Sequence, residues 1–146
     1  MVMNIFRILF LSIFLFFYGN ALADYQAILK KASQGNAEAQ YTLGTMYELG
    51  EGVAEDDAEA FKWFSLAASH GYAKAQNNLG YMYDLGEGIA QDNLRAYMWK
   101  DLAAAQGEID AAKQRDALAS RMTKQQLEKA QEMARDCKAR NYKGCD

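Results

Sequence analysis

Side chains that could carry out catalysis are sparse in this chain of 146 residues. Histidine, the commonest general base and a frequent metal ligand, occurs once, at His70. One histidine cannot by itself complete a catalytic triad or a metal site. No spacing of serine with lysine or histidine indicates a nucleophilic site. We therefore predict no catalytic residues, no metal site and no cofactor.

Two Gly-x-Gly pairs, Gly50–Gly52 and Gly86–Gly88, invite comparison with phosphate-binding loops. A dinucleotide-binding loop lies between a strand and a helix N-terminus. These pairs instead follow helical patterns, so we interpret them as helix C-caps, where glycine enters the left-handed conformation freely. The acidic residues Glu51, Glu55, Asp56 and Asp57 lack the alternating carboxylates of a calcium-binding EF-hand loop. They are typical of a solvated helix N-terminus.

Cys137 and Cys145 are the only cysteines. If a helix ran through both, their Cα atoms would lie about 12 Å apart, beyond the roughly 7 Å that a disulfide can bridge. A disulfide therefore requires the chain to fold back, which Asn141–Gly144 could do. An even pair of cysteines in an exported protein indicates a disulfide. Closing this loop would add roughly 2–3 kcal/mol of stability.

The N-terminus has the pattern of an export signal. Arg7 precedes an apolar run over Ile8–Tyr18, and Ala21-Leu22-Ala23 provides small residues at a cleavage site. We predict a signal peptide over residues 1–23, cut after Ala23, and a periplasmic or secreted protein. The alternative is an uncleaved anchor, but a membrane span needs roughly 20 apolar residues. The mature chain is expected to keep no stable membrane span.

Charge is unevenly distributed along the mature chain. Residues 24–112 contain 6 basic and 14 acidic side chains, whereas residues 113–146 contain 9 basic and 5 acidic ones. A nucleic-acid-binding protein should present a basic face, so the acidic part argues against that class. The basic end is typical of solvated helix surface, although it could serve as an interaction patch.

The chain repeats itself at a spacing of 36 residues. Residues 37–71 and 73–107 are identical at 19 of 35 paired positions. In each unit a helical pattern ends at Gly-x-Gly, and a second helix begins after Asp56 or Asp92. Glu59, three residues after Asp56, suggests a capping box. Such self-similarity predicts an all-α solenoid of helix hairpins, in which each unit buries its apolar face by stacking on the next.

The ends of the chain continue this pattern incompletely. We predict one domain over residues 24–146, made of a half repeat (24–36), two repeats (37–72 and 73–108) and a divergent capping hairpin (109–146). We expect about six helices, the last beginning at a capping box of Thr123 with Gln126. The aromatic residues that recur in phase should pack in the core, namely Tyr47, Tyr83, Trp63 and Trp99. His70 occupies the position of Gln34 and Gln106 in the neighbouring units, a polar helix end.

The phrase Ala-x-Ala-Gln-x-x-Leu-Gly-x-Met-Tyr-x-x-Gly-x-Gly-Val/Ile, followed by Asp and Trp-x-x-x-Ala-Ala, resembles the Sel-like repeat (SLR) family, which is related to the tetratricopeptide repeats. Ala54 and Ala90 stand where that family often has proline. The resemblance implies a right-handed superhelical scaffold that binds proteins, without catalytic residues common to its members. Exported bacterial members are typically periplasmic or secreted. Some cysteine-rich relatives bind or hydrolyse β-lactams, which leaves such an enzyme as the alternative function.

The first helix of each unit should line the concave surface of such a solenoid. Its residues outside the core phase differ between units while the core positions agree, which suits recognition of a protein or an extended peptide. The alternative is that these residues are free surface. The predicted partner-binding residues are Glu38, Tyr41, Thr42, Thr45, Glu48, Lys74, Asn77, Asn78, Tyr81 and Asp84. The sequence predicts neither the partner nor the oligomeric state.

Overall fold

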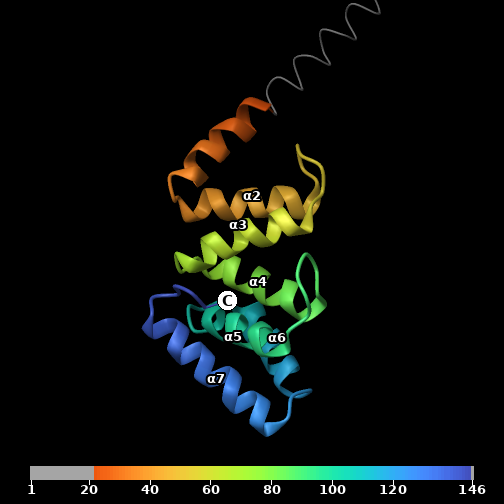
Figure 1. Cartoon of the computed structure of the whole chain (residues 1–146), viewed down its shortest axis with the longest axis vertical. Helices are drawn as coiled ribbons and strands as arrows, with labels where there is room; N and C mark the ends of the chain where they lie inside the picture. Colours follow the sequence, from red (N-terminus) through yellow and green to blue (C-terminus); the bar gives the residue numbers. More distant parts are fainter. Residues whose placement is uncertain (1–21, 146) are drawn as a thin grey trace, which may run out of the picture.

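A computed structural model describes residues 22–145, and these residues form a stack of helices with no strand among them (Figure 1). The predicted signal peptide, apart from its last two residues, lies outside this range. A helical segment over residues 22–33 comes first. The helices that follow are α2 (Ala37–Leu49), α3 (Asp57–Ser69), α4 (Ala73–Leu85), α5 (Asn93–Ala104), α6 (Ile109–Ala119) and α7 (Lys124–Ala139).

The fold class is the predicted all-α solenoid. Residues 22–145 contain seven helical segments, close to the about six expected: one from the half repeat and two from each of the three hairpins. Consecutive helices pack on one another from α2 to α6, and α7 turns back to pack against α5. Within residues 22–145, no helix combines the length and apolar character that crossing a membrane requires.

The glycine pairs act as caps, as predicted. Gly50 and Gly86 have φ values of 66° and 79°, and their amides bond to the carbonyl oxygens of Met46 and Met82. A side chain at either position would be strained in this left-handed conformation. Each first helix therefore ends at the same place in its unit.

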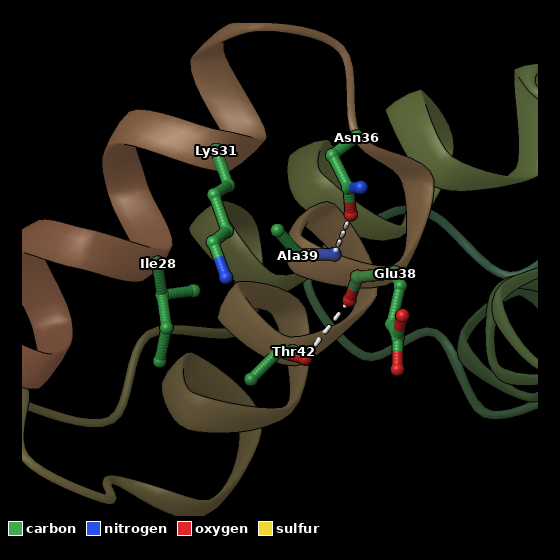
Figure 2. A pocket seen from close by; sticks show the side chains of 6 residues that line it. All are labelled: Ile28, Lys31, Asn36, Glu38, Ala39 and Thr42. Atoms are coloured by element: carbon green, nitrogen blue, oxygen red, sulfur yellow. Dashed lines mark hydrogen bonds between the residues drawn. The ribbon is translucent and has the colours of Figure 1, made fainter.

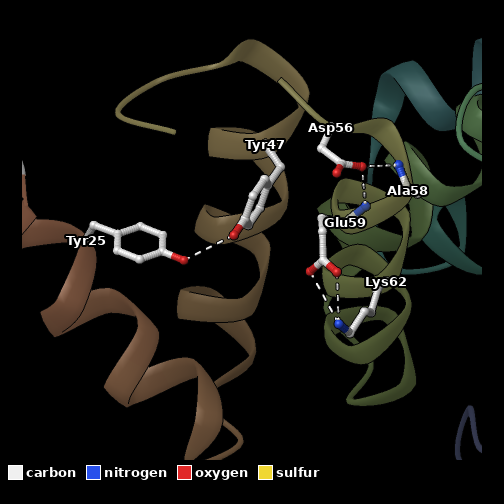
Figure 3. Close-up of polar contacts among 6 residues, drawn as sticks. All are labelled: Tyr25, Tyr47, Asp56, Ala58, Glu59 and Lys62. Carbon is white, nitrogen blue, oxygen red and sulfur yellow. Dashed lines mark hydrogen bonds and ion pairs between the residues drawn. The ribbon is translucent and has the colours of Figure 1, made fainter. Parts of the chain in front are cut away.

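The second helices begin at aspartate caps, although one predicted detail is wrong. The Asp56 carboxylate accepts hydrogen bonds from the amides of Ala58 and Glu59, both at 3.0 Å (Figure 3). Glu59 does not complete a capping box, because its carboxylate pairs instead with Lys62 Nζ at 3.0 Å. The predicted capping box of Thr123 with Gln126 is present at α7.

The core runs through the middle of the stack. Phe64, Leu79 and Trp99 are almost fully buried, and Tyr83 is 5% exposed. A smaller cluster around Leu43 joins residues 22–33 to α2. Trp63 belongs to this end cluster and is only half-buried, unlike its counterpart Trp99. Burial of the repeated aromatics thus weakens toward the N-terminal end, where fewer units cover them.

One aromatic contact recurs in the repeat register. The hydroxyl oxygens of Tyr25 and Tyr47 lie 3.0 Å apart (Figure 3). Exactly one unit later in sequence, Phe61 and Tyr83 meet edge to face with ring centroids 5.4 Å apart. The helical segment over residues 22–33 therefore packs on α2 as α3 packs on α4.

A buried glutamine joins each unit to the one before it. Gln40 Nε2 donates to the Ala32 carbonyl at 3.1 Å, and Gln76 Nε2 donates to the Ala68 carbonyl at 3.3 Å. Both carbonyls lie at the end of a preceding second helix and already accept from the amides of Gly35 and Gly71. The glutamines add a second hydrogen bond to each carbonyl and join the units inside the stack.

His70 has the structural role that its repeat position predicts. Its Nδ1 lies 3.0 Å from Gln40 Oε1, an acceptor, so this nitrogen carries the proton in the bond. In the next unit Gln106 Nε2 donates to Gln76 Oε1 at 2.7 Å. The imidazole therefore replaces an amide donor at a helix end.

The C-terminal cysteines form the predicted disulfide. Cys137 and Cys145 are bonded, with their Cα atoms 5.3 Å apart. The chain folds back between them through positive φ values at Asn141, Tyr142 and Gly144. Asparagine and glycine adopt this conformation readily, whereas tyrosine does so rarely. The predicted turn and the disulfide thus close the end of α7.

Candidate partner-binding surface

The predicted partner-binding residues lie on the first helices of the two units, α2 and α4. They differ in their exposure and in the contacts that their side chains already make. Thr42 and Thr45 bond to carbonyls of their own helix, with Thr42 Oγ1 donating to the Glu38 carbonyl at 2.8 Å. These bonds leave the methyl groups as the contact surface. Glu38 is exposed, and its carboxylate forms no ion pair with another residue of 22–145.

Tyr41 is mainly a packing residue, contrary to the interpretation that it faces a partner. Its ring is half-buried, with its centroid 5.7 Å from that of Phe64 and 5.2 Å from that of Tyr72. It therefore fills the space between α3 and the beginning of α4. A helical phase alone could not distinguish this position from free surface, because the ring packs against residues 23 and 31 positions further along the chain.

Glu48, near the end of α2, lies in acidic surroundings. Its carboxyl group is half-buried, and burial together with Glu87 and Asp57 raises its pKa above the usual value. Within residues 22–145, however, no group of three or more histidine, cysteine or acidic side chains is arranged to hold a metal ion.

The α4 residues differ from those of α2. Tyr81 is 43% exposed, and Lys74 is exposed as well. Asn77 is half-buried, and its side-chain oxygen is enclosed without a hydrogen-bond partner. Asp84 pairs with Arg121, from the turn after α6, at 3.1 Å. The α4 surface therefore offers one exposed aromatic ring, whereas the enclosed Asn77 oxygen is turned away from solvent.

Behind Tyr81 lies a buried lysine that was not predicted. Lys100, on α5, is 0% exposed and donates a hydrogen bond to Gln114 Oε1 on α6. Its Nζ lies 5.7 Å from the centroid of the Tyr81 ring. Burial lowers the pKa of this amine from 10.5 to about 8, although Asp84 acts in the opposite direction.

Comparison of the two repeated units would have predicted that Lys100 is buried. It occupies the repeat position of Phe64, which packs on Gly44 so closely that a Cβ atom there would lie 2.5 Å from the ring. The corresponding glycine, Gly80, would bring a Cβ within 2.8 Å of Lys100 Cγ. The alkyl part of lysine thus takes the place of the phenyl ring, and only its ammonium group departs from the pattern.

A cavity of about 260 Å³ lies at the N-terminal end of the stack. Figure 2 shows it between the helical segment over residues 22–33, which contributes Ile28 and Lys31, and the beginning of α2. From the predicted surface only Glu38 and Thr42 line it, together with Asn36. Asn36 Oδ1 caps α2 by accepting from the amide of Ala39 at 2.8 Å.

Comparisons with known proteins agree with this architecture. The family model described as the Sel1 repeat matches residues 37–72 and 73–108. A search of curated proteins found no match. The crystal structure of c5321, a protective antigen of uropathogenic Escherichia coli strains with an SLR fold, is similar at a TM-score of 0.76 and 27% identity. That match covers 81% of this chain but 26% of c5321, so this chain spans about a quarter of that relative.

A second solved structure gives the stronger evidence of relationship. The Sel1 repeat protein from Oxalobacter formigenes is 39% identical, with a TM-score of 0.61, over 62% of this chain and 68% of that protein. Sel1 repeats generally mediate protein–protein interaction and are not catalytic. With the glycine-capped hairpins repeated in register, these matches show that the chain belongs to the Sel1 repeat family.

Proposed function

We propose that this protein is a non-catalytic interaction scaffold of the bacterial cell envelope, which binds a protein or an extended peptide on the surface of its first helices. The observation that carries the proposal is the contrast between neighbouring units. Their packing residues and buried glutamine bonds are repeated, whereas their first-helix surface residues differ. A stack of uniform units with a variable face is suited to recognition rather than to chemistry.

The disulfide supports the proposed compartment. A bond between Cys137 and Cys145 is compatible with an oxidising environment such as the periplasm or the exterior. The sequence pattern of residues 1–23 favours the same location.

Tyr81 is the proposed centre of the surface. Its exposed ring offers apolar area at low entropic cost, and the half-buried Asn77 lies one turn before it on α4. Glu38, Thr42, Thr45, Lys74, Asn78 and Asp84 would form the polar surroundings. Tyr41 supports this surface from within, through its packing against α3 and the N-cap of α4.

Site-specific photocrosslinking tests the proposal. A benzophenone amino acid at Tyr81 is expected to crosslink a partner in living cells, and excess unlabelled chain should suppress that product. Leu66 on α3 is the matched control, because it is 40% exposed, close to the 43% of Tyr81, and lies on a second helix. Equal crosslinking from both positions, or none from Tyr81, would contradict the proposed surface. The folded double variant Tyr81→Ala, Asn77→Ala should capture less of the same partner at an unchanged melting temperature.

No contact in residues 22–145 favours the β-lactam-hydrolysing alternative. The buried amine of Lys100 contacts Gln114 and the Tyr81 ring rather than a serine hydroxyl. We expect the purified chain to hydrolyse a chromogenic β-lactam no faster than buffer does. Turnover above that background, lost on substitution of Lys100, would overturn the non-catalytic assignment.

A further inference from the structure

The cavity at the N-terminal end corresponds to a position that is filled one unit later. Its lining residues Ile28 and Asn36 occupy the repeat positions of Phe64 and Tyr72. In that later unit the ring of Tyr41, from the preceding first helix, contacts both of these side chains. The cavity is therefore the place where a first helix with an aromatic side chain would pack, and no described residue provides that helix.

We propose that this cavity docks a helix of a partner protein, with an aromatic side chain inserted between Ile28 and Asn36. The inference rests on the proposed scaffold function. It specifies what kind of partner residue binds at the N-terminal end of the protein. The packing of Tyr41 in the next unit defines the occupant as an aromatic residue on a helix. If residues 1–23 are removed at export, as their sequence predicts, the processed chain cannot supply that helix itself.

Charge adds a second element to the partner. Equivalent positions on successive first helices alternate in sign, from Glu38 to Lys74 to Asp110. Glu38 lines the cavity and forms no ion pair with another described residue, so a basic residue on the docked helix would find its carboxylate available. In α2 this position precedes Tyr41 by three residues, which puts both side chains on one helix face.

The polar lining favours tyrosine or tryptophan over phenylalanine. Lys31 extends from the first helix toward α2 across the cavity, as Figure 2 shows. Its ammonium group can lie over an aromatic face or donate to a phenol oxygen. The partner segment is thus a helix with the pattern Lys/Arg-x-x-Tyr/Trp.

A peptide based on the chain itself provides a defined probe. It carries the sequence of residues 36–50 with Glu38→Lys, a fluorophore, and an i, i+4 side-chain link on the face away from Tyr41 that keeps so short a helix formed. The protein is the chain recovered from expressing cells, with its N-terminus determined by mass spectrometry. Fluorescence anisotropy should show saturable binding, and Tyr41→Ala in the peptide should weaken it at least fivefold.

Two variants of the protein locate the binding. Thr42→Trp fills the cavity and should weaken peptide binding more than tenfold, since the Thr42 hydroxyl serves only its own helix. Ser69→Trp is the matched control, because Ser69 is also half-buried, its hydroxyl likewise bonds to a carbonyl of its own helix, and it lies on α3, outside both the cavity and the proposed binding surface. It should leave binding within twofold. Circular dichroism should show that both variants are folded.

Several results would contradict the inference. Absence of saturable binding, or equal binding to the Thr42→Trp chain, would overturn the inference. Dimers in sedimentation that Thr42→Trp dissociates would assign the cavity to a second copy and would also overturn it. Crosslinking from Tyr81 tests the proposed scaffold function independently of the docking of a helix in the cavity. If that crosslink persists while the peptide fails to bind, only the docking of a helix is refuted.

Discussion

Replacing the buried lysine by methionine should make the protein more stable. Burial lowers the pKa of Lys100 from 10.5 to about 8, which corresponds to roughly 3 kcal/mol against the charged form in the folded state. Methionine has a similar shape and no charge. Loss of the hydrogen bond to Gln114 and of the contact with the Tyr81 ring reduces this gain in stability by about 1 kcal/mol. Lys100→Met should therefore raise the free energy of unfolding by about 2 kcal/mol at pH 7.

The same substitution should change how stability depends on pH. Because the unfolded lysine holds its proton more tightly than the folded one, the free energy of unfolding of the unchanged chain should rise as pH increases from about 8 toward 10.5. Below pH 8 both states are protonated, so this contribution is constant there. The advantage of Lys100→Met should accordingly shrink between pH 8 and pH 10.5.

Urea unfolding at pH 7 and pH 9.5, followed by the fluorescence of the two tryptophans, measures both effects. Lys74→Met is the control, because Lys74 is exposed and its replacement should change stability by no more than about 0.5 kcal/mol. A less stable Lys100→Met at pH 7 would refute the reasoning. So would an advantage of equal size at both pH values.

Three further predictions concern the packing and the two ends of the fold. Leu79→Asp places a charge in a fully buried position and should abolish the helical circular dichroism at 25 °C, whereas Leu85→Asp, at a 51% exposed position, should stay folded. Cys145→Ser removes the disulfide and should lower the free energy of unfolding in urea by roughly 2–3 kcal/mol; no loss would mean that the tail holds itself. Tyr25→Phe removes the hydroxyl whose hydrogen bond is the main cause of the raised pKa of Tyr47, about 12. An ultraviolet titration should then find this pKa closer to 10, and an unchanged value would contradict the contact.

The helix boundaries were predictable where the signal is local. The α2 helix ends before Gly50 as predicted, because a glycine in the left-handed conformation is a requirement of the turn itself. The aspartate cap at Asp56 follows from the same local chemistry. Its capping box did not form, since Lys62 competes for the Glu59 carboxylate three residues along the helix. Two local interactions of similar strength cannot be ranked from sequence.

The contacts between helices were harder to predict. Periodicity indicates which face of a helix is apolar, but it does not say that Tyr41 on α2 reaches Tyr72, the N-cap of α4. Lys100 was overlooked because a charged residue in a helix is usually solvated. Its burial follows from Gly80, whose missing side chain admits the lysine stem. Both errors concern neighbours 20 to 36 residues away in sequence, which a reading of single helices does not compare.

The paired glutamine bonds have a consequence for how such a protein can grow or end. Because the Gln40 and Gln76 joints use the same partners in the same register, an inserted copy of 36 residues would find matching bonds on both sides. Duplication could lengthen the array without inventing a new junction. At the next equivalent position stands Ala112, which has no amide to offer. Repeats could therefore be added between the existing units but not after the final hairpin. The alanine that stands at the glutamine position marks the end of the series of repeats.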